Sequence, residues 1–347
     1  MIRKRISDET VAVTPEESDD LLALRRVVSA GDRIVSDTTR VTKIDREYSR
    51  PDSGKRVKIR IALDVEGVSL DSQLDRLRIR GVIAESNNEL VSRGSYHSVV
   101  VKPGDRLTLT KRSWSGLHRR LLTGHDAPGF VLVAIDVSEC GVGRLKGTHL
   151  RMIPDIRSGY SGKRYRHAFR VEKFLAEVKD LLLGVAEKSD TIVLFGPGQT
   201  KNKLAGFLRS SMGEYKIVLA EGIDAAGQDG LYAFTRSDVM RETMAESKLA
   251  QVSSIIDDIM AMVGRGSHRF AMGVTDTRRA VRLGAVKALI FSGRVLKEAD
   301  EDAVVELIND AQSQGATTYS VDSSTDVGLR VDGLGSIVAL LRFELKV

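Results

Sequence analysis

The sequence has 347 residues, of which 42% are hydrophobic and 29% charged, as expected for a globular protein of two or three domains. Its formal net charge of +6 permits a polyanionic partner. The single cysteine, Cys140, excludes an internal disulfide framework, and no apolar run reaches the ~18 residues of a transmembrane helix. Because the N-terminus also lacks the apolar segment of a signal peptide, we expect a cytoplasmic protein without membrane contact.

Residues 1–126 are predicted to be rich in β-strands. Apolar and polar residues alternate with a period of two in "RIVSDTTRVTKI", "KRVKIRIALDVEGV", "LRIRGVIAES" and "HSVVVKPGDRLTLTK". One helix interrupts them, with Thr14 as its N-cap, Pro15 at its first position, Glu17 completing a capping box and Gly31 ending it. Several short strands with one helix predict a small barrel.

Residues 127–264 are predicted to form an α/β domain. The nearly continuous apolar run "FVLVAIDVS" is typical of a buried strand, and further strands are expected at "DTIVLFGPG" and "KIVLAEG". A long helix is expected from the N-cap Ser237 to Gly264. Another helix should bury apolar residues at helical spacing, namely Phe174, Val178, Leu181, Leu182 and Val185.

Residues 265–347 are predicted to form a second, smaller α/β domain. The segment "GRGSHRF" marks the boundary before it. Two helices, "TDTRRAVRLG" and "EDAVVELINDAQSQG", alternate there with the strands "VKALIFS" and "TTYSVD". The sequence therefore predicts a multidomain α+β and α/β protein.

A basic segment, "RSGYSGKRYRHAF", follows the first strand of the middle domain. It contains Arg157, Lys163, Arg164 and Arg166, and no acid lies between Asp155 and Glu172. Arg and Lys are suited to RNA phosphates or a partner's acids, and the interspersed tyrosines to base stacking. A solvated surface loop is the alternative; the glycine spacing does not match a nucleotide-binding P-loop.

A second basic segment lies in the first domain, around the turn signal Pro51 to Gly54. Four basic residues surround this turn: Arg46, Arg50, Lys55 and Arg56. On a small barrel they would lie at the tip of a protruding hairpin. They are candidates for RNA or partner binding, and an ordinary solvated hairpin is the alternative.

Two groups of carboxylates are candidates for a divalent metal site. Asp64 and Glu66 are two positions apart on one strand, and four acids lie near the start of the first helix: Glu16, Glu17, Asp19 and Asp20. Paired carboxylates can hold a cation for phosphodiester cleavage. Acids in a first helical turn also simply complement the helix dipole. Neither the catalytic residues nor the metal ligands are assigned beyond these candidates.

Several segments together resemble the Pelota family of translation-surveillance factors. They include "VAVTPEESDDLLALRRVVSAGDRIVSDTTRVTKI" and "RGVIAESNNELVSRGSYHSVVVKPGDRLTLTKRSW" in the first domain, "FGPGQTKN" and "DAAGQDGLYAF" in the middle domain, and "VDGLGSIVALLRF" in the last. The resemblance covers the whole chain in order. Gln199 and Leu22 depart from the family's usual residues, and the absence of an acidic tail after Val347 suggests an archaeal member.

The resemblance implies an Sm-like β-barrel followed by two α/β domains of release-factor type. Release factors carry a Gly-Gly-Gln tripeptide that brings water to peptidyl-tRNA, and this sequence has none. We therefore expect a monomeric factor that enters the A site of stalled ribosomes, contacting rRNA and mRNA, without hydrolysing peptidyl-tRNA. Its implied partners are an elongation-factor-like GTPase, docked by the last two domains, and an ABC-type ribosome-recycling ATPase.

Two other functions remain open from the sequence. Family members have been proposed to be endoribonucleases that cleave stalled mRNA with a divalent metal ion, which would be the protein's cofactor; otherwise no cofactor is expected. The acidic candidates named above would then carry the reaction, although their spacing shows no distinctive general base. The other function is general RNA binding, without a preference for the ribosome.

Overall fold

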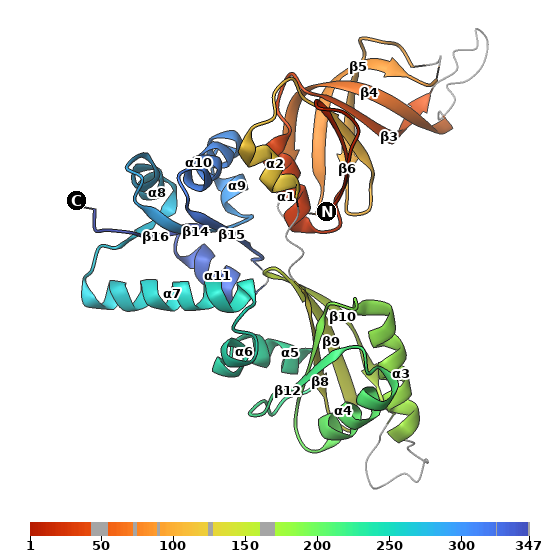
Figure 1. Ribbon diagram of the computed structural model, residues 1–347, viewed down its shortest axis with the longest axis vertical. Helices are drawn as coiled ribbons and strands as arrows, with labels where there is room; N and C mark the ends of the chain where they lie inside the picture. Colours follow the sequence, from red (N-terminus) through yellow and green to blue (C-terminus); the bar gives the residue numbers. More distant parts are fainter. Residues whose placement is uncertain are drawn as a thin grey trace, which may run out of the picture. The chain divides into compact units, whose positions relative to one another are not determined.

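The structure, a computed structural model, describes residues 1–42, 55–71, 75–88, 91–123, 128–159, 171–323 and 325–345 (Figure 1). Its contacts divide the chain into two compact units. Unit 1 contains Met1–His125 and Gly293–Ala316, and unit 2 contains Asp126–Ser292 and Thr317–Val347. The division into three domains at 1–126, 127–264 and 265–347 remains a prediction from the sequence. Within the described ranges, every helix is too short or too polar to span a bilayer.

Unit 1 is built on a seven-stranded antiparallel sheet. Its strands lie in the order β1 (Ile2–Arg5), β2 (Thr10–Thr14), β7 (Leu107–Thr110), β3 (Arg33–Thr42), β4 (Lys55–Leu70), β5 (Leu77–Ser86) and β6 (Tyr96–Val101). The predicted period of two is confirmed in β5, where Leu77 and Ile79 are buried while Arg78 and Arg80 are exposed. The sheet curls so that its apolar face encloses a core (Figure 1).

The helix α1 (Ser18–Val27) packs against β4 and β5. Its predicted start at Thr14 is wrong, because Thr14 is the last residue of β2 and pairs with Ile2 of β1. Strand pairing therefore holds this residue, and Glu17 is the N-cap, without a side-chain capping bond. The predicted end at Gly31 is also too late, since Val28 is already extended.

Unit 1 also contains α2 (Gly116–Leu122), α9 (Val295–Glu298) and α10 (Glu301–Ser313). Two buried arginines of α1 bind α10: Arg25 donates to Glu301 and Asp302, and Arg26 donates from Nε to Asn309 Oδ1 at 2.8 Å. Burial lowers the pKa of Arg26 to about 10. These bonds join positions more than 270 residues apart.

Unit 2 contains a five-stranded sheet in the order β10 (His149–Arg157), β9 (Glu139–Lys146), β8 (Phe130–Ile135), β11 (Thr191–Phe195) and β12 (Lys216–Leu219). Strands β8, β11 and β12 are parallel, whereas β9 and β10 are antiparallel. The apolar run of β8 has a direct explanation, because helices cover both faces of this sheet (Figure 1).

Alternate residues of β8 belong to two different cores. Val131 and Val133 pack in the core with α3 (Val171–Val185) and α4 (Thr200–Ser211), whereas Leu132 packs in the core with α5 (Gly227–Thr235). In the second core Phe195 and Phe234 stack with ring centroids 4.3 Å apart. On α3 the predicted residues Phe174, Val178 and Leu182 are buried, while Leu181 and Val185 are partly buried.

The predicted long helix from Ser237 to Gly264 is two helices. Ser237 is confirmed as an N-cap, but its helix, α6, ends at Thr243 (Asp238–Thr243). A second helix, α7 (Lys248–Arg265), begins after Ser247, whose hydroxyl accepts from the Ala250 N–H at 3.1 Å. Ser247 thus satisfies a donor of a new helix rather than continuing the old one, because serine favours capping over helix interiors.

The last sheet of unit 2 has the order β13 (Phe270–Met272), β16 (Ile337–Leu341), β14 (Val286–Ser292) and β15 (Thr317–Val321). Strand β14 is parallel to β15 and antiparallel to β16. The accompanying helices are α8 (Gly273–Arg282) and α11 (Asp326–Gly333). Val327 and Val331 of α11 join Ile256 and Ile259 of α7 in one core.

Candidate nucleic-acid interface

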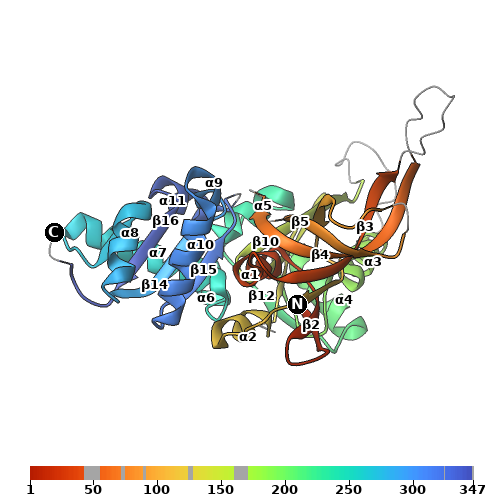
Figure 2. The same cartoon turned by 90° about the horizontal axis from the view of Figure 1, so that it is seen from above.

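The predicted basic hairpin in unit 1 is formed by β3 and β4. The two strands pair from Arg33 with Asp64 to Thr42 with Lys55, ten residue pairs in all. At ~3.3 Å per residue this ladder is about 33 Å long. Figure 2 shows the two strands side by side, projecting away from α1. The first four pairs lie inside the sheet, because β3 also pairs with β7 from Arg33 to Ser36 and β4 pairs with β5 from Ile61 onward. The other six pairs, from Asp37 with Arg60 to Thr42 with Lys55, form a two-stranded arm about 20 Å long.

The predicted tip residues are only partly placed. Lys55 and Arg56 begin β4, where their backbones pair with Thr42 and Val41. Arg46 and Arg50 lie outside the described residues.

Two further basic residues of the arm were not singled out from the sequence. Lys58 and Arg60 are exposed, whereas Ile59 and Ile61 between and after them are buried. The period of two therefore places both charges on one solvent-facing side of β4. The alternation in "KRVKIRIAL" carried this signal, so the positive charge of the arm extends from its tip toward the barrel.

The second basic segment begins at the edge of the first sheet of unit 2. Arg157 is exposed, ends β10 and pairs with Glu139 of β9. The Ser158 N–H then donates to Ser138 O at 2.8 Å, which holds the start of the segment on the sheet. Lys163, Arg164 and Arg166 lie outside the described residues.

The acids near α1 surround the N-terminal ammonium group. Met1 N lies 2.7 Å from Glu16 Oε2 and 2.9 Å from Asp20 Oδ2. Burial lowers the pKa of this ammonium, but the hydrogen bonds to both carboxylates outweigh it and raise the pKa above its ordinary value. Asp20 also accepts from the Glu16 N–H at 2.8 Å. Two of the four candidate acids therefore hold a cation of the chain itself, while Glu17 and Asp19 lie at the helix start.

The other acidic pair is separated by a β-bulge. Asp64 binds Arg33 through two hydrogen bonds, at 2.7 and 3.1 Å. The pairing with β5 shifts between Val65 and Gly67, so Glu66 is the extra residue. The bulge interrupts the period of two between these acids, and Asp64 is already bound to Arg33. In the described parts of the chain, His, Cys, Asp and Glu form no group of three or more that could hold a metal ion.

A buried ion pair joins the end of β7 to the turn after α1. Lys111 Nζ donates to Val27 O at 2.8 Å and to Asp32 Oδ2, and both side chains are more than 90% buried. Asp32 Oδ2 also accepts from the Ser29 N–H at 2.8 Å. Lys111, which lies in a segment that resembles the family, therefore has a structural role: it ties β7 to the turn after α1.

The segment "FGPGQTKN" forms a tight turn between β11 and α4. A Cβ at Gly196 would lie 2.3 Å from Ile135 O, and the φ of Gly196 is +125°. The buried Lys201 donates to Gly196 O at 2.9 Å and lies 2.6 Å from Glu221 Oε2. The lysine therefore stabilises the turn, which gives this motif a structural role.

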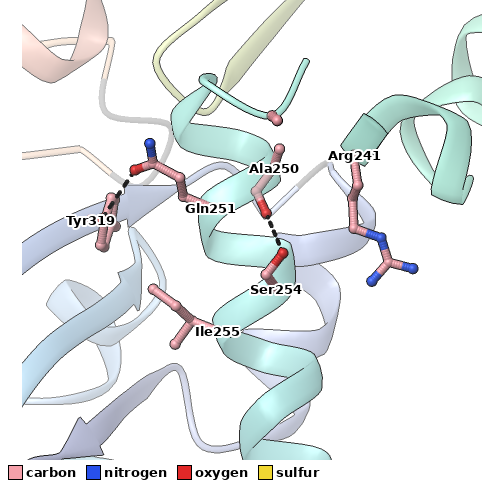
Figure 3. Close-up of a pocket in the computed structure, with 7 residues that line it drawn as sticks. Arg241, Ala250, Gln251, Ser254, Ile255 and Tyr319 are labelled. Carbon is pink, nitrogen blue, oxygen red and sulfur yellow. Dashed lines mark hydrogen bonds between the residues drawn. The ribbon is translucent and has the colours of Figure 1, made fainter. Parts of the chain in front are cut away.

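A cavity of about 380 Å³ lies along α7 and β15 in unit 2 (Figure 3). Gln251 and Tyr319 point toward each other there, and the Tyr319 hydroxyl donates to Gln251 Oε1 at 3.3 Å. Burial raises the pKa of Tyr319. Arg241 also lines this cavity, but its guanidinium group already binds Asp238 and Asp257, so we do not propose an anion site there.

The comparisons with known proteins agree along the whole chain. Residues 1–125 match the family described as Pelota N-terminal domain, and residues 249–345 match eRF1 domain 3. The protein pelota homolog of Nitrosopumilus maritimus is 48% identical over 349 residues, covering all of both chains. That of Cenarchaeum symbiosum is also 48% identical, covering 99% of this chain and all of the relative.

Among solved structures, the Thermoplasma acidophilum Pelota protein matches with a TM-score of 0.64 at 20% identity, covering 99% of this chain and all of that chain. This likeness supports the multidomain fold. The two relatives at 48% identity establish more than the fold, because they align over essentially their full length. The chain belongs to the Pelota family.

Proposed function

We propose that this protein recognises stalled ribosomes and rescues them by binding in the A site. The observation that carries the proposal is the full-length 48% identity to archaeal pelota homologs. The sequence has no Gly-Gly-Gln tripeptide, so the protein acts without hydrolysing peptidyl-tRNA. It works in mRNA surveillance (no-go decay) and in ribosome recycling, in the cytoplasm.

The arm of unit 1 supplies the contact with RNA in this proposal. Six residue pairs project beyond the rest of the sheet as a narrow two-stranded arm, with exposed Lys58 and Arg60 on one side. Positive side chains on such an arm bind phosphates of mRNA or rRNA whatever their sequence. That property suits a factor that acts at any codon.

The partners supply the energy of the reaction. An elongation-factor-like GTPase delivers the protein, docked on residues 127–264 and 265–347, and an ABC-type recycling ATPase drives subunit separation. The protein contributes shape and charge. Arg157, Lys163, Arg164 and Arg166 contact RNA phosphates or acids of the GTPase; the absence of acids between Asp155 and Glu172 supports this role.

Binding to ribosomes tests the proposal. The protein should bind ribosomes with an empty A site and compete with aminoacyl-tRNA. If three of the four residues Arg157, Lys163, Arg164 and Arg166 touch RNA, replacing all four with Ala should make the salt dependence of log K shallower by roughly two to three units. Equal binding to occupied and empty A sites would contradict the proposal.

A matched control removes the same charge from elsewhere in unit 2. Lys173, Lys203, Arg209 and Lys216 are exposed, and their replacement by Ala should leave affinity and salt slope almost unchanged. Lost GTPase binding with ribosome affinity intact would make the basic segment a protein-docking site.

We do not propose the endoribonuclease as a second function. Glu16 and Asp20 hold the N-terminal ammonium, and Asp64 holds Arg33. No interaction among the described residues favours metal binding at these acids.

A further inference from the structure

A second basic site lies in unit 1, in a cavity of about 270 Å³ beside α2 and the start of the chain. Four arginines line it: Arg3 and Arg5 from β1, and Arg119 and Arg120 from α2. The indole of Trp114 and the apolar side chain of Leu122 also line it. Sequence patterns did not reveal this site, because its two halves are more than 100 positions apart.

Local structure places the arginines on the cavity. Strand β1 is exposed along its whole length and pairs Arg3 with Val13 and Arg5 with Val11. Alternation therefore puts Arg3 and Arg5 on one side of the strand. On the other wall, a capping box between Ser115 and His118 starts α2, whose last turn carries Arg119 and Arg120.

The indole of Trp114 is held in place by the backbone. Its Nε1 donates to Glu9 O at 3.0 Å, and the ring of His118 lies edge-on to it with centroids 6.4 Å apart. Since indole has one hydrogen-bond donor and no acceptor, a ligand meets only the π surface of Trp114. A fixed aromatic surface beside cations is the combination that binds unpaired nucleotides.

The charges of the cavity are not balanced within the described chain. Asp8, which also lines it, pairs with Arg5. Across the described residues no carboxylate forms an ion pair with Arg3, Arg119 or Arg120. These three guanidinium groups therefore give the cavity an excess of positive charge, which an anion can balance. Arginine is also the side chain best suited to hold phosphate oxygens through two hydrogen bonds.

We propose that this cavity binds one unpaired nucleotide of an RNA strand, with the phosphate on Arg3, Arg119 and Arg120 and the base against Trp114. The inference rests on the proposed function and adds a second RNA contact to the basic arm. The volume of about 270 Å³ is near the lower limit of small-molecule sites, which suits one nucleotide. Stacking on an indole and contacts to phosphate do not depend on the identity of the base, so this mode of binding tolerates any sequence.

The sequence provides a direct probe, because Trp114 is the only tryptophan in the chain. Unlabelled hexauridylate should quench its fluorescence saturably in the full-length protein. UMP should quench it more weakly, because a nucleotide within a strand carries a phosphate on each side and UMP only one, and inorganic phosphate should quench it least because it has no base to stack. The basic arm and the segment after Arg157 contribute no tryptophan signal, so the quenching reports this cavity.

Two matched variants make the test specific. R119A/R120A should weaken the fluorescence-detected affinity at least tenfold and make the salt slope shallower by ~0.7 for each phosphate that is no longer bound. R78A/R93A, which removes two exposed arginines of unit 1 that do not line the cavity, should change neither. Labelled hexauridylate in an anisotropy assay should bind Trp114→Phe more tightly than Trp114→Ala, because phenylalanine retains a stacking surface. Melting curves verify that each variant is folded.

Several results would overturn the inference. They are the absence of quenching by hexauridylate, equal quenching in R119A/R120A, phosphate or UMP binding as tightly as the strand, and quenching by polyglutamate alone. Ribosome binding by the unaltered protein is measured separately. Its failure would contradict the proposed function, whereas intact ribosome binding without quenching would remove only this site.

Discussion

The buried pair of Lys111 and Asp32 gives the sharpest prediction about stability. Methionine at position 111 keeps much of the length of lysine but cannot donate to Asp32 or to Val27 O. Asp32, only 8% exposed, would keep its bond from the Ser29 N–H and lose its counter-charge. An uncompensated buried charge costs ~3–5 kcal/mol, so K111M should destabilise unit 1 by that amount.

The same magnitude can be expressed as a melting temperature. For a unit of about 150 residues, each kcal/mol corresponds to ~2–4 °C, so K111M should lower the melting temperature by roughly 6–20 °C. Trp114, three positions from Lys111 and the only tryptophan, reports unfolding of unit 1 by its fluorescence. The double variant K111M/D32N should lose less stability than the two single losses added together, because it leaves no buried charge unpaired.

Lys102 provides the control, since it is exposed in the same unit. K102M should change stability by less than ~0.5 kcal/mol. If K111M melted within that range of the unaltered protein, the reasoning about an uncompensated charge would be refuted.

Two other predictions concern acid and cleavage. Burial and the charge of Lys111 lower the pKa of His118, so the unfolded state binds a proton more readily than the folded state. The stability of unit 1 should therefore fall as the pH decreases from ~7 to ~5. Melting curves of H118Q should show a weaker dependence on pH. If RNA cleavage by highly purified protein is intrinsic, D19A/D20A or D64A/E66A should abolish it in Mg²⁺ or Mn²⁺. Cleavage that persists in both double variants, or without metal, would exclude these acids as the catalytic residues.

Much of the fold followed from local patterns. The sequence of strand β5 alternates apolar and polar residues, as its burial pattern does, and the unbroken apolar run of β8 reflects burial on both faces of the sheet. The features that local patterns missed were decided by non-local pairing or by a single side chain. Thr14 belongs to a strand because β1 and β7 pair with β2, and Ser247 divides a helix that its apolar spacing would have continued.

Less of the candidate site than of the fold could be predicted from the sequence. The basic arm was predicted because its charges are neighbours in sequence. The cavity at Trp114 was not, since β1 is an edge strand whose residues are all exposed and carry no alternating pattern. The bulge at Glu66 could not be read from the sequence either, because it depends on the register between β4 and β5.

Ribosome rescue without peptide release is tested most simply by subunit separation on stalled ribosomes that carry labelled peptidyl-tRNA. The full-length protein is added with its GTPase and the recycling ATPase, and the subunits are resolved on a sucrose gradient. We expect the subunits to separate while the peptide stays attached to its tRNA. Release of free peptide, or the same extent of separation when this protein is omitted, would contradict it.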